Sequence, residues 1–344
     1  MTPKQFAFLA AAAGLSLIVA IAVHAARQPW APGASGTTKL FPDLAADAGK
    51  IARVSVTQGG DTLTLEKTGD TKSGDRWLMK NQDGYPASTD KVRALIAALA
   101  DARLLEPKTR LATRHAALEL DDPAGKLSRA RFVRLEDASG VLLAEVIAGK
   151  SKPAAHTSGA GAETYVRRPG DGQSWLASSD IAGDSKLKSW AEPRVFELKT
   201  ETISSLTVEL PGQPAYVIKR GDDGAHTLAD IPARKRVKYV NMIDNIIEAA
   251  TFLDLEKVRK ASATPGSDAG TVSFETDAGL KITLKIRRDK DDTWATIEAK
   301  GEGEAKQAAA DIAARAGGWE FAILPSKADT MLKKHDDLLE DAAS

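Results

Sequence analysis

The sequence contains no cysteine among its 344 residues. This absence excludes disulfide bonds, thiolate metal sites and cysteine nucleophiles, and it also excludes the lipid-modified cysteine of a bacterial lipoprotein. Cysteine usage therefore says nothing about the compartment in which the protein folds. That compartment has to be inferred from the N-terminal sequence.

The sequence also lacks an excess of charge of either sign, because 47 lysine and arginine residues balance 47 aspartate and glutamate residues. A neutral chain produces no long-range field that would attract nucleic acid. We therefore expect no nucleic-acid partner, and any electrostatic recognition has to be local.

Motifs that carry catalytic or cofactor chemistry are missing as well. The five histidines show no paired metal-ligand spacing, and the sequence has neither a phosphate-binding loop nor a Gly-x-Ser-x-Gly nucleophile elbow. Acidic pairs occur where turns are expected, so we interpret them as solvated. We predict no catalytic residue, no cofactor and no metal. Two carboxylates of a glycosidase-type site can meet in space without leaving a sequence spacing, which keeps a hydrolase as an alternative.

The longest apolar run is the N-terminal segment from Phe6 to Ala26, which has 21 residues and no formal charge. A helix of this length spans roughly 30 Å, the thickness of the hydrocarbon core of a bilayer. We predict a cytoplasmic stub and transmembrane anchor over residues 1–27 and a tether rich in Pro, Gly and small polar residues over 28–40. A signal peptide cleaved near Val23 is the alternative. The side chains predicted to contact lipid are Phe6, Phe8, Leu9, Leu15, Leu17, Ile18, Val19, Ile21 and Val23.

The charges that flank this segment are nearly balanced, with Lys4 before it and Arg27 after it. A signal anchor favours a cytoplasmic N-terminus and an exported body. We therefore expect a single-pass protein of the bacterial inner membrane with the bulk of the chain in the periplasm.

Two stretches of the chain match each other in order and spacing, which is the signature of an internal repeat. Apolar residues recur from Ile51 to Val56 and again from Ile203 to Val208, and each run is followed by a second alternating run. Alternation of this kind predicts half-buried strands paired as hairpins. A gapless match between residues 135–141 and 274–280 predicts a strand, a tight turn and a returning strand in each copy.

Each copy also contains one helical pattern, and in the first copy Ser88 to Asp90 supply side-chain oxygens for an N-cap. The apolar positions at helical spacing are Val92, Leu95, Ile96 and Leu99 in the first copy and Val240, Ile243 and Ile247 in the second. We expect loops at Gly149–Gly161 and Arg259–Gly270, and a short helix with a frayed tail after Lys327.

The sequence therefore predicts an α+β protein, in which an N-terminal transmembrane helix precedes two related strand-rich repeats, each an antiparallel sheet with one main helix. We place the first repeat at residues 41–190, the second at 191–330 and a charged tail at 331–344.

One local concentration of charge stands out where the second helix begins. It consists of Arg234, Lys235, Arg236 and Lys238. A solvated helix start explains such a cluster, and a docking patch for anionic lipid or an acidic protein is the functional alternative.

The order of these motifs resembles the membrane-tethered periplasmic repeat proteins of domain-of-unknown-function family 4340. The resemblance rests on the Ile51-x-x-Val54-x-Val56 opening followed by Trp77-Leu78, the helix from Val92 to Leu99, and the closing run from Trp319 to Pro325. Members are often encoded beside ABC transporters of the gliding-motility type, which implies an accessory role. One departure is that His226 stands where a second tryptophan is expected.

These observations lead us to expect a non-catalytic, membrane-anchored binding or scaffold protein that is accessory to an ABC-type transport system. A transporter permease or another envelope protein is the expected partner. The alternatives are an envelope hydrolase acting on glycan or peptide, and a purely structural spacer.

Overall fold

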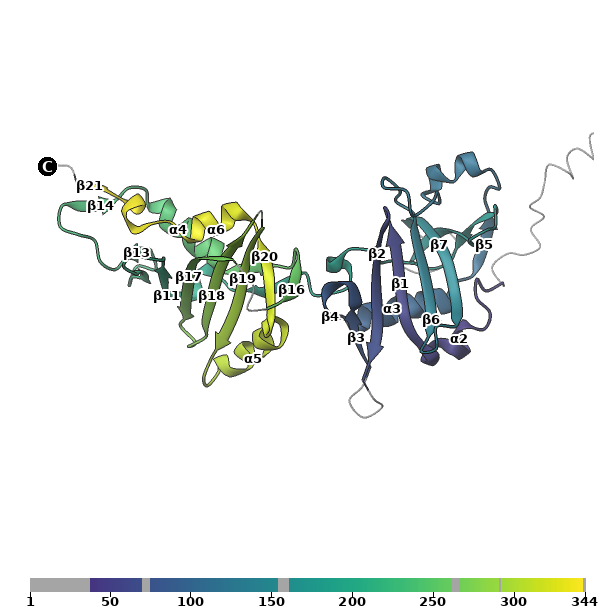
Figure 1. Ribbon diagram of the computed structural model, residues 1–344, viewed down its shortest axis with the longest axis horizontal. Helices are drawn as coiled ribbons and strands as arrows, with labels where there is room; N and C mark the ends of the chain where they lie inside the picture. Colours follow the sequence, from purple (N-terminus) through teal and green to yellow (C-terminus); the bar gives the residue numbers. More distant parts are fainter. Residues whose placement is uncertain (1–37, 70–74, 154–160, 262–265, 291, 343–344) are drawn as a thin grey trace, which may run out of the picture. The chain divides into compact units, whose positions relative to one another are not determined.

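The computed structural model describes residues 38–69, 75–153, 161–261, 266–290 and 292–342 (Figure 1). The predicted anchor residues, from Phe6 to Val23, lie outside the described residues. Within the described part of the chain, no helix is both long enough and apolar enough to cross a membrane. The described residues form two compact units, with those up to Lys67 and from Asp90 to Ser185 in unit 1 and those from Thr68 to Thr89 and from Lys186 onward in unit 2.

Unit 1 is built on an antiparallel sheet in which the order of its strands is β2-β1-β6-β7-β8-β9-β5. The strands are β1 (Ile51–Gln58), β2 (Asp61–Thr68), β5 (Leu104–Pro107), β6 (Arg131–Asp137), β7 (Leu142–Pro153), β8 (Ala162–Arg167) and β9 (Ser174–Ala177). The helices are α2 (Leu44–Asp47) and α3 (Thr89–Asp101), with short 3-10 turns η1 (Ala48–Lys50), η3 (Ala112–Arg114) and η4 (Ala116–Leu118).

One face of this sheet is buried because apolar residues alternate along its strands. Val54 and Val56 of β1 are fully buried, as is Leu135 of β6. Helix α3 runs behind the sheet in Figure 1, and its residues Leu95 and Leu99 are at most 3% exposed. The strands at Ile51 and the helix at Val92 are thus where the sequence pattern predicted them.

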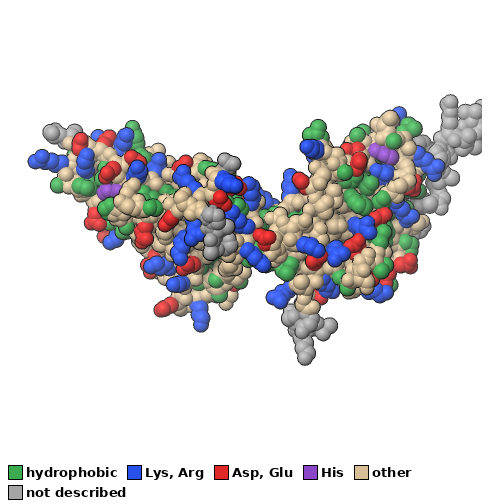
Figure 2. Space-filling view, in the orientation of Figure 1, with side chains coloured by type: hydrophobic (Ala, Val, Ile, Leu, Met, Phe, Trp, Pro, Cys, Tyr) green, Lys and Arg blue, Asp and Glu red, His purple; other side chains and the backbone are tan. Residues whose placement is uncertain are grey.

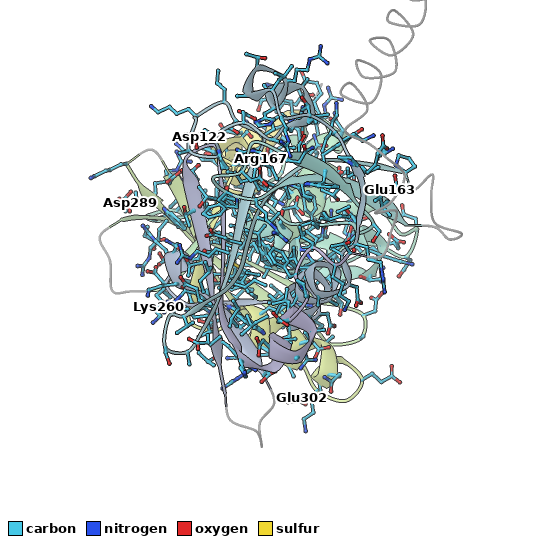
Figure 3. The ribbon with its side chains drawn as sticks, turned by 90° about the vertical axis from the view of Figure 1, so that its right-hand side faces the viewer. Asp122, Glu163, Arg167, Lys260, Asp289 and Glu302 are labelled. Atoms are coloured by element: carbon cyan, nitrogen blue, oxygen red, sulfur yellow. The ribbon has the colours of Figure 1, made fainter. Side chains whose placement is uncertain are left out.

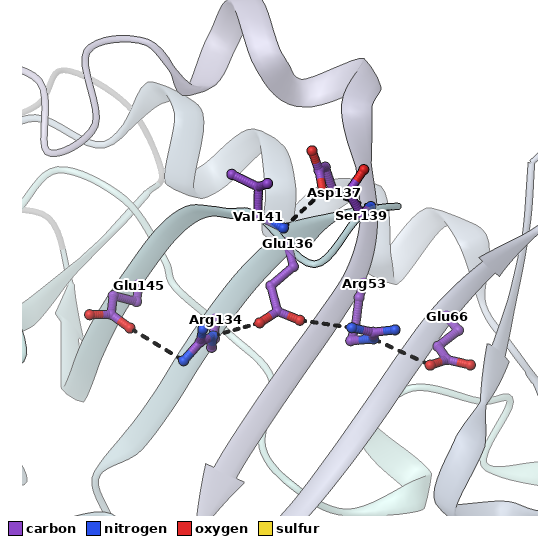
Figure 4. A network of polar contacts seen from close by, with 8 residues as sticks. All are labelled: Arg53, Glu66, Arg134, Glu136, Asp137, Ser139, Val141 and Glu145. Carbon is purple, nitrogen blue, oxygen red and sulfur yellow. Dashed lines mark hydrogen bonds and ion pairs between the residues drawn. The ribbon is translucent and has the colours of Figure 1, made fainter.

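The opposite face of the same sheet carries a row of ion pairs (Figure 4). Arg53 lies between Glu66, at 3.2 Å, and Glu136, at 3.0 Å, and these residues are direct cross-strand neighbours on β2, β1 and β6. Arg134 extends the row, because its Nε lies 2.8 Å from Glu136. The row is charged and solvated, which explains the polar half of the alternating pattern.

Unit 2 contains an eight-stranded antiparallel sheet with the order β13-β12-β11-β17-β18-β19-β20-β16. Its strands are β11 (Ile203–Glu209), β12 (Tyr216–Arg220), β13 (His226–Leu228), β16 (Val258–Lys260), β17 (Ser267–Thr276), β18 (Lys281–Asp289), β19 (Asp292–Lys300) and β20 (Trp319–Ile323). Three further antiparallel pairs are β3 (Arg76–Met79) with β4 (Tyr85–Ala87), β10 (Arg194–Glu197) with β15 (Phe252–Asp254), and β14 (Lys235–Val237) with β21 (Leu339–Asp341). The helices are α4 (Val240–Ala250), α5 (Ala305–Ala316) and α6 (Pro325–Met331), with 3-10 turns η2 (Lys80–Gln82), η5 (Leu187–Ser189), η6 (Thr200–Thr202) and η7 (His335–Leu338).

The core of unit 2 lies between its sheet and its helices. Ile243 and Ile247 of α4 are each 1% exposed, as the helical spacing predicts. The ring of Tyr85 packs edge-on against Trp319, with the ring centroids 5.0 Å apart, which accounts for the grouping of Thr68–Thr89 with this unit. Burial also raises the pKa of Tyr85 to about 12.

The α+β class with antiparallel sheets is confirmed, but unit 2 departs from the expectation of one main helix. Helix α5 buries Ala305, Ala309 and Ile312 at helical spacing, a stripe too small in side-chain volume to stand out in the sequence. The charged tail forms strand β21 where a frayed end was expected. The first expected loop is shorter than predicted, because β7 continues to Pro153.

Candidate binding cleft in the second unit

Unit 2 contains a cleft of about 460 Å³ that is bounded by α4, β15, the end of β20 and α6. This volume lies within the range of small-molecule sites in proteins. The apolar residues that line it are Ala249, Phe252, Leu253, Ala322, Ile323 and Leu324. Leu253, Ala322 and Ile323 are buried, whereas Leu324 is 64% exposed. The cleft therefore presents apolar surface to the solvent.

The local sequence explains how the walls of the cleft arise. Helix α4 turns its isoleucines into the core, which leaves Asn245, Glu248 and Ala249 on the side that faces the cleft. Pro325 at the first position of α6 starts a new helix directly after β20, because its fixed φ suits that position. The short helix then places Lys327 on the opposite wall.

Lys327 is the cation that lines this cleft. Its Nζ donates a hydrogen bond to the carbonyl oxygen of Phe252 at 2.6 Å and lies 3.3 Å from the centroid of the Phe252 ring. Burial lowers the pKa of Lys327 to about 8; nearby Asp254 raises it and Arg194 lowers it further. The site thus holds a lysine that is partly desolvated and readily loses its proton.

Three carboxylates also line the cleft, those of Glu248, Asp254 and Glu256. Asp254 accepts a hydrogen bond from Arg194 Nε at 3.1 Å, and Glu256 forms an ion pair with Lys188. Glu248 is exposed on α4. Two of the three acids are therefore engaged by cations.

Two further hollows contain histidines, and neither gathers a metal-ligand set. In unit 1, a hollow is lined by His115, Asp122 and Arg167, the last two labelled in Figure 3. The buried ring of His115 is held by the Gly172 carbonyl at 3.0 Å. In unit 2, the ring of His335 packs on Tyr216, with the centroids 5.5 Å apart. No group of three histidine or acidic residues in the described ranges is arranged to bind a metal ion.

The histidine that replaces the expected second tryptophan also has a structural position. His226 is 8% exposed in β13, and its Nε2 lies 2.9 Å from the carbonyl oxygen of Ile203. A buried polar ring that is satisfied by a backbone carbonyl needs no ligand to explain it.

The predicted docking patch lies on and around β14. Lys235 forms an ion pair with Asp341 at 2.7 Å, and Arg236 forms one with Glu340 at 2.6 Å. Lys238 lies over the ring of the exposed residue Tyr239. Acidic residues of β21 therefore neutralise part of the patch, and Figure 2 shows acidic and basic side chains interspersed over the visible face.

The cleft itself was not anticipated from the sequence. The sequence offered no reason to single out Phe252, and Lys327 was predicted only as the start of a short helix with a frayed tail. These two residues are 75 positions apart, so no local motif could reveal their contact.

The family model described as "Domain of unknown function (DUF4340)" matches residues 77–281, which is more than half of the chain. The chain therefore belongs to this family. Comparison with curated proteins and with solved structures gave no match.

Proposed function

We propose that this protein is a non-catalytic binding or scaffold protein of the bacterial inner membrane, accessory to an ABC-type transport system. The observation that carries the binding role is the cleft of unit 2, whose apolar lining is held by two helices and two strands. Sites built on helices and strands hold a ligand in a defined position.

The same cleft supports binding over hydrolysis. A glycosidase-type mechanism needs one carboxyl group that protonates the leaving group and a second that attacks or activates water. Two of the three carboxylates in this cleft are engaged, Asp254 by Arg194 and Glu256 by Lys188. Each of these ion pairs engages a carboxylate that such a mechanism would need to be free to act on the substrate.

The membrane location is proposed from the sequence of Phe6 to Ala26, whose length and lack of charge suit a single span. A periplasmic body follows from a signal anchor with a cytoplasmic N-terminus. The accessory role is proposed from membership of the family, because the resemblance implies a genetic association with ABC transporters.

We further propose that the two units are related repeats. The strand order β2-β1-β6-β7-β8-β9-β5 in unit 1 parallels β12-β11-β17-β18-β19-β20-β16 in unit 2. The β1–β6 register shifts between Ile51 and Arg53, and the β11–β17 register shifts between Ile203 and Ser205. β-Bulges at equivalent places support common ancestry, because bulges persist within families.

The hairpin turns support the same proposal. Gly140 and Gly279 have φ values of 84° and 80° and occupy the same place in the two turns. In each turn the glycine N–H donates to a carbonyl three residues earlier, that of Asp137 in one and Thr276 in the other. An experimental structure that lacked one of the two bulges or one of these turns would contradict the repeat.

The accessory role is tested by purifying the tagged full-length chain from membranes solubilised in mild detergent. We expect the permease and the ATPase of one ABC transporter to be recovered in fixed proportion to the chain, as measured by quantitative mass spectrometry. A tagged single-pass protein expressed at the same level is the control. Recovery of no ABC component above this control would contradict the role.

A further inference from the structure

We propose that the cleft between α4 and α6 binds one small amphipathic carboxylate, an apolar chain that ends in a carboxylate group accepted by Lys327. This inference rests on the proposed binding function and names the class of ligand that the cleft would take. It does not depend on the transporter.

The first argument is the distribution of apolar and polar atoms in the cleft. The cleft offers apolar contacts from Phe252, Ile323 and the exposed residue Leu324. Lys327 adds one cationic group to the same lining. An ammonium group has three N–H donors, and the acceptor found for it among the described residues is the Phe252 carbonyl. Donors therefore remain for a ligand.

The charged residues that line the cleft favour a ligand with a single negative charge. The acids that line the cleft are Glu248 of α4, Asp254 of β15 and Glu256, which follows β15. Asp254 and Arg194 of β10 are the charged residues that act on Lys327. A dianion such as a phosphate monoester would bring a second negative charge to a cleft whose lining contains one cation, Lys327, and three acids. A monocarboxylate restores a one-to-one ion pair with Lys327.

The third argument is the desolvation of the lysine. A partly desolvated ammonium group interacts more strongly with an anionic acceptor than a fully hydrated ammonium group does. A neutral ligand would not provide this gain, and a cationic ligand would be repelled. The cleft therefore discriminates between ligands of equal length by the charge of their head group.

The binding of a carboxylate would also move a proton. The pKa of Lys327 is about 8, and a carboxylate at hydrogen-bonding distance would raise it. Near pH 8 the free site is only partly protonated, so binding would take up a fraction of a proton per site. Neither an alcohol nor an amine of the same length would do so.

The experiment is a calorimetric titration of octanoate into the full-length chain held in lipid nanodiscs, with empty nanodiscs as the reference. We expect one site, and proton uptake at pH 8 measured from the binding enthalpy in two buffers of different ionisation enthalpy. Octanol should bind at least about ten-fold more weakly, because hydrogen bonds to charged groups contribute that much or more. Octylamine should not bind at the site.

Two variants complete the test. Lys327→Met keeps the length and apolar stem of the side chain, and it should weaken octanoate binding about ten- to a hundred-fold and abolish the proton uptake. Lys306→Met, at an exposed position of α5, is the matched control and should change neither. Circular dichroism and thermal unfolding verify that each variant is folded.

The proposal is overturned if octanoate does not bind, if octanol or octylamine binds as tightly, or if Lys327→Met leaves affinity and proton uptake unchanged. Any of these results could coexist with recovery of the ABC components. Conversely, octanoate binding without ABC recovery would retain the ligand and remove the transporter role, so the two failures are distinguishable.

Discussion

The side-chain nitrogen of Lys327 lies 3.3 Å from the centroid of the Phe252 ring and 2.6 Å from the carbonyl oxygen of the same residue. One residue of β15 thus provides both a π face and a backbone acceptor to a lysine of α6. The guanidinium carbon of Arg194 also approaches this ring, at 5.5 Å from its centroid. The two contacts of Lys327 with Phe252 partly offset the desolvation of the ammonium group, because cation–π interactions gain strength away from water, whereas the nearby Arg194 repels it.

The lowered pKa of Lys327 predicts a specific dependence of stability on pH. Below pH 8 the lysine is protonated in the folded and the unfolded chain, and the folded state bears the cost of the desolvated charge. Between about 8 and the ordinary value of 10.5, the folded state releases its proton while the unfolded state keeps it. The unfolded state then binds more protons, so the free energy of unfolding rises with pH.

We expect the free energy of unfolding to rise by about 1 kcal/mol. This is well below the free energy that corresponds to the whole pKa difference, because the side chain is partly exposed and its charge is screened by water. The measurement is the denaturant unfolding free energy of the wild type minus that of Lys327→Met, taken at several pH values from 7 to 10.5. The subtraction removes the other titrating groups. A difference that stays flat or falls with pH would show that the ammonium group is not desolvated.

A second prediction concerns Gly149, where β7 shifts its register against β8 between Ala148 and Ser151. A Cβ atom at this glycine would lie 2.1 Å from the carbonyl oxygen of Leu118. Gly149→Ala should therefore destabilise unit 1 by about 2–4 kcal/mol, because the backbone has to move to relieve the overlap.

The matched control for this substitution is Gly49→Ala. A Cβ atom at Gly49 would meet nothing within 4 Å, so this variant should change stability by less than about 0.5 kcal/mol. Thermal and denaturant unfolding measure both. Equal stability of the two variants would mean that the loop carrying Leu118 does not approach β7 closely in solution.

The strands and the helix of unit 1 could be predicted because their signals are local. Alternation from Ile51 to Val56 reports one buried face of a strand, and the spacing of Val92, Leu95 and Leu99 reports one buried face of a helix. Both patterns follow from the geometry of a single element.

The elements that were missed depend on distant partners or on small side chains. The sequence of β21 predicted a charged tail. The segment forms a strand because Leu339 pairs with Val237 of β14. Helix α5 presents mostly alanine to the core, so its periodicity is weak in hydrophobicity. The cleft needs α4, β15, β20 and α6 together, and only the tertiary structure brings these elements to one place.

A third prediction concerns the row of ion pairs on the sheet of unit 1. Glu136 is flanked by Arg53 and Arg134 at 3.0 and 2.8 Å, and its side chain is 14% exposed. A double-mutant cycle on Arg53→Met and Glu136→Gln should give a coupling energy of about 0.5–1 kcal/mol, because the carboxylate is held in a network.

The comparison pair for this cycle is Lys285 and Glu298, whose side chains are 53% and 52% exposed. Their coupling energy should be about 0.3 kcal/mol or less, since water screens an exposed, isolated pair. Both coupling energies are obtained from unfolding free energies measured in low salt. In 1 M salt, the coupling energy of Arg53 and Glu136 should fall by more kcal/mol than that of Lys285 and Glu298. Equal couplings would show that the network adds nothing to the single pairs.

The last prediction concerns the docking patch of Arg234, Lys235, Arg236 and Lys238. If this patch contacts an acidic partner, Arg234→Glu together with Lys235→Glu should reduce the recovery of that partner with the full-length chain. Asp341→Asn should act in the opposite direction, because it removes the acid that pairs with Lys235 and leaves the patch more positive.

The control is Lys306→Glu, which changes charge on α5 at an exposed position away from β14. Recovery is measured by quantitative mass spectrometry at low and at moderate salt, since electrostatic docking weakens as salt screens it. If the patch docks a partner, recovery of that partner should fall for the Arg234→Glu and Lys235→Glu double variant, rise for Asp341→Asn and stay the same for Lys306→Glu. If recovery is the same for all of them at low salt, Lys235 and its neighbours serve only to hold β14 against β21.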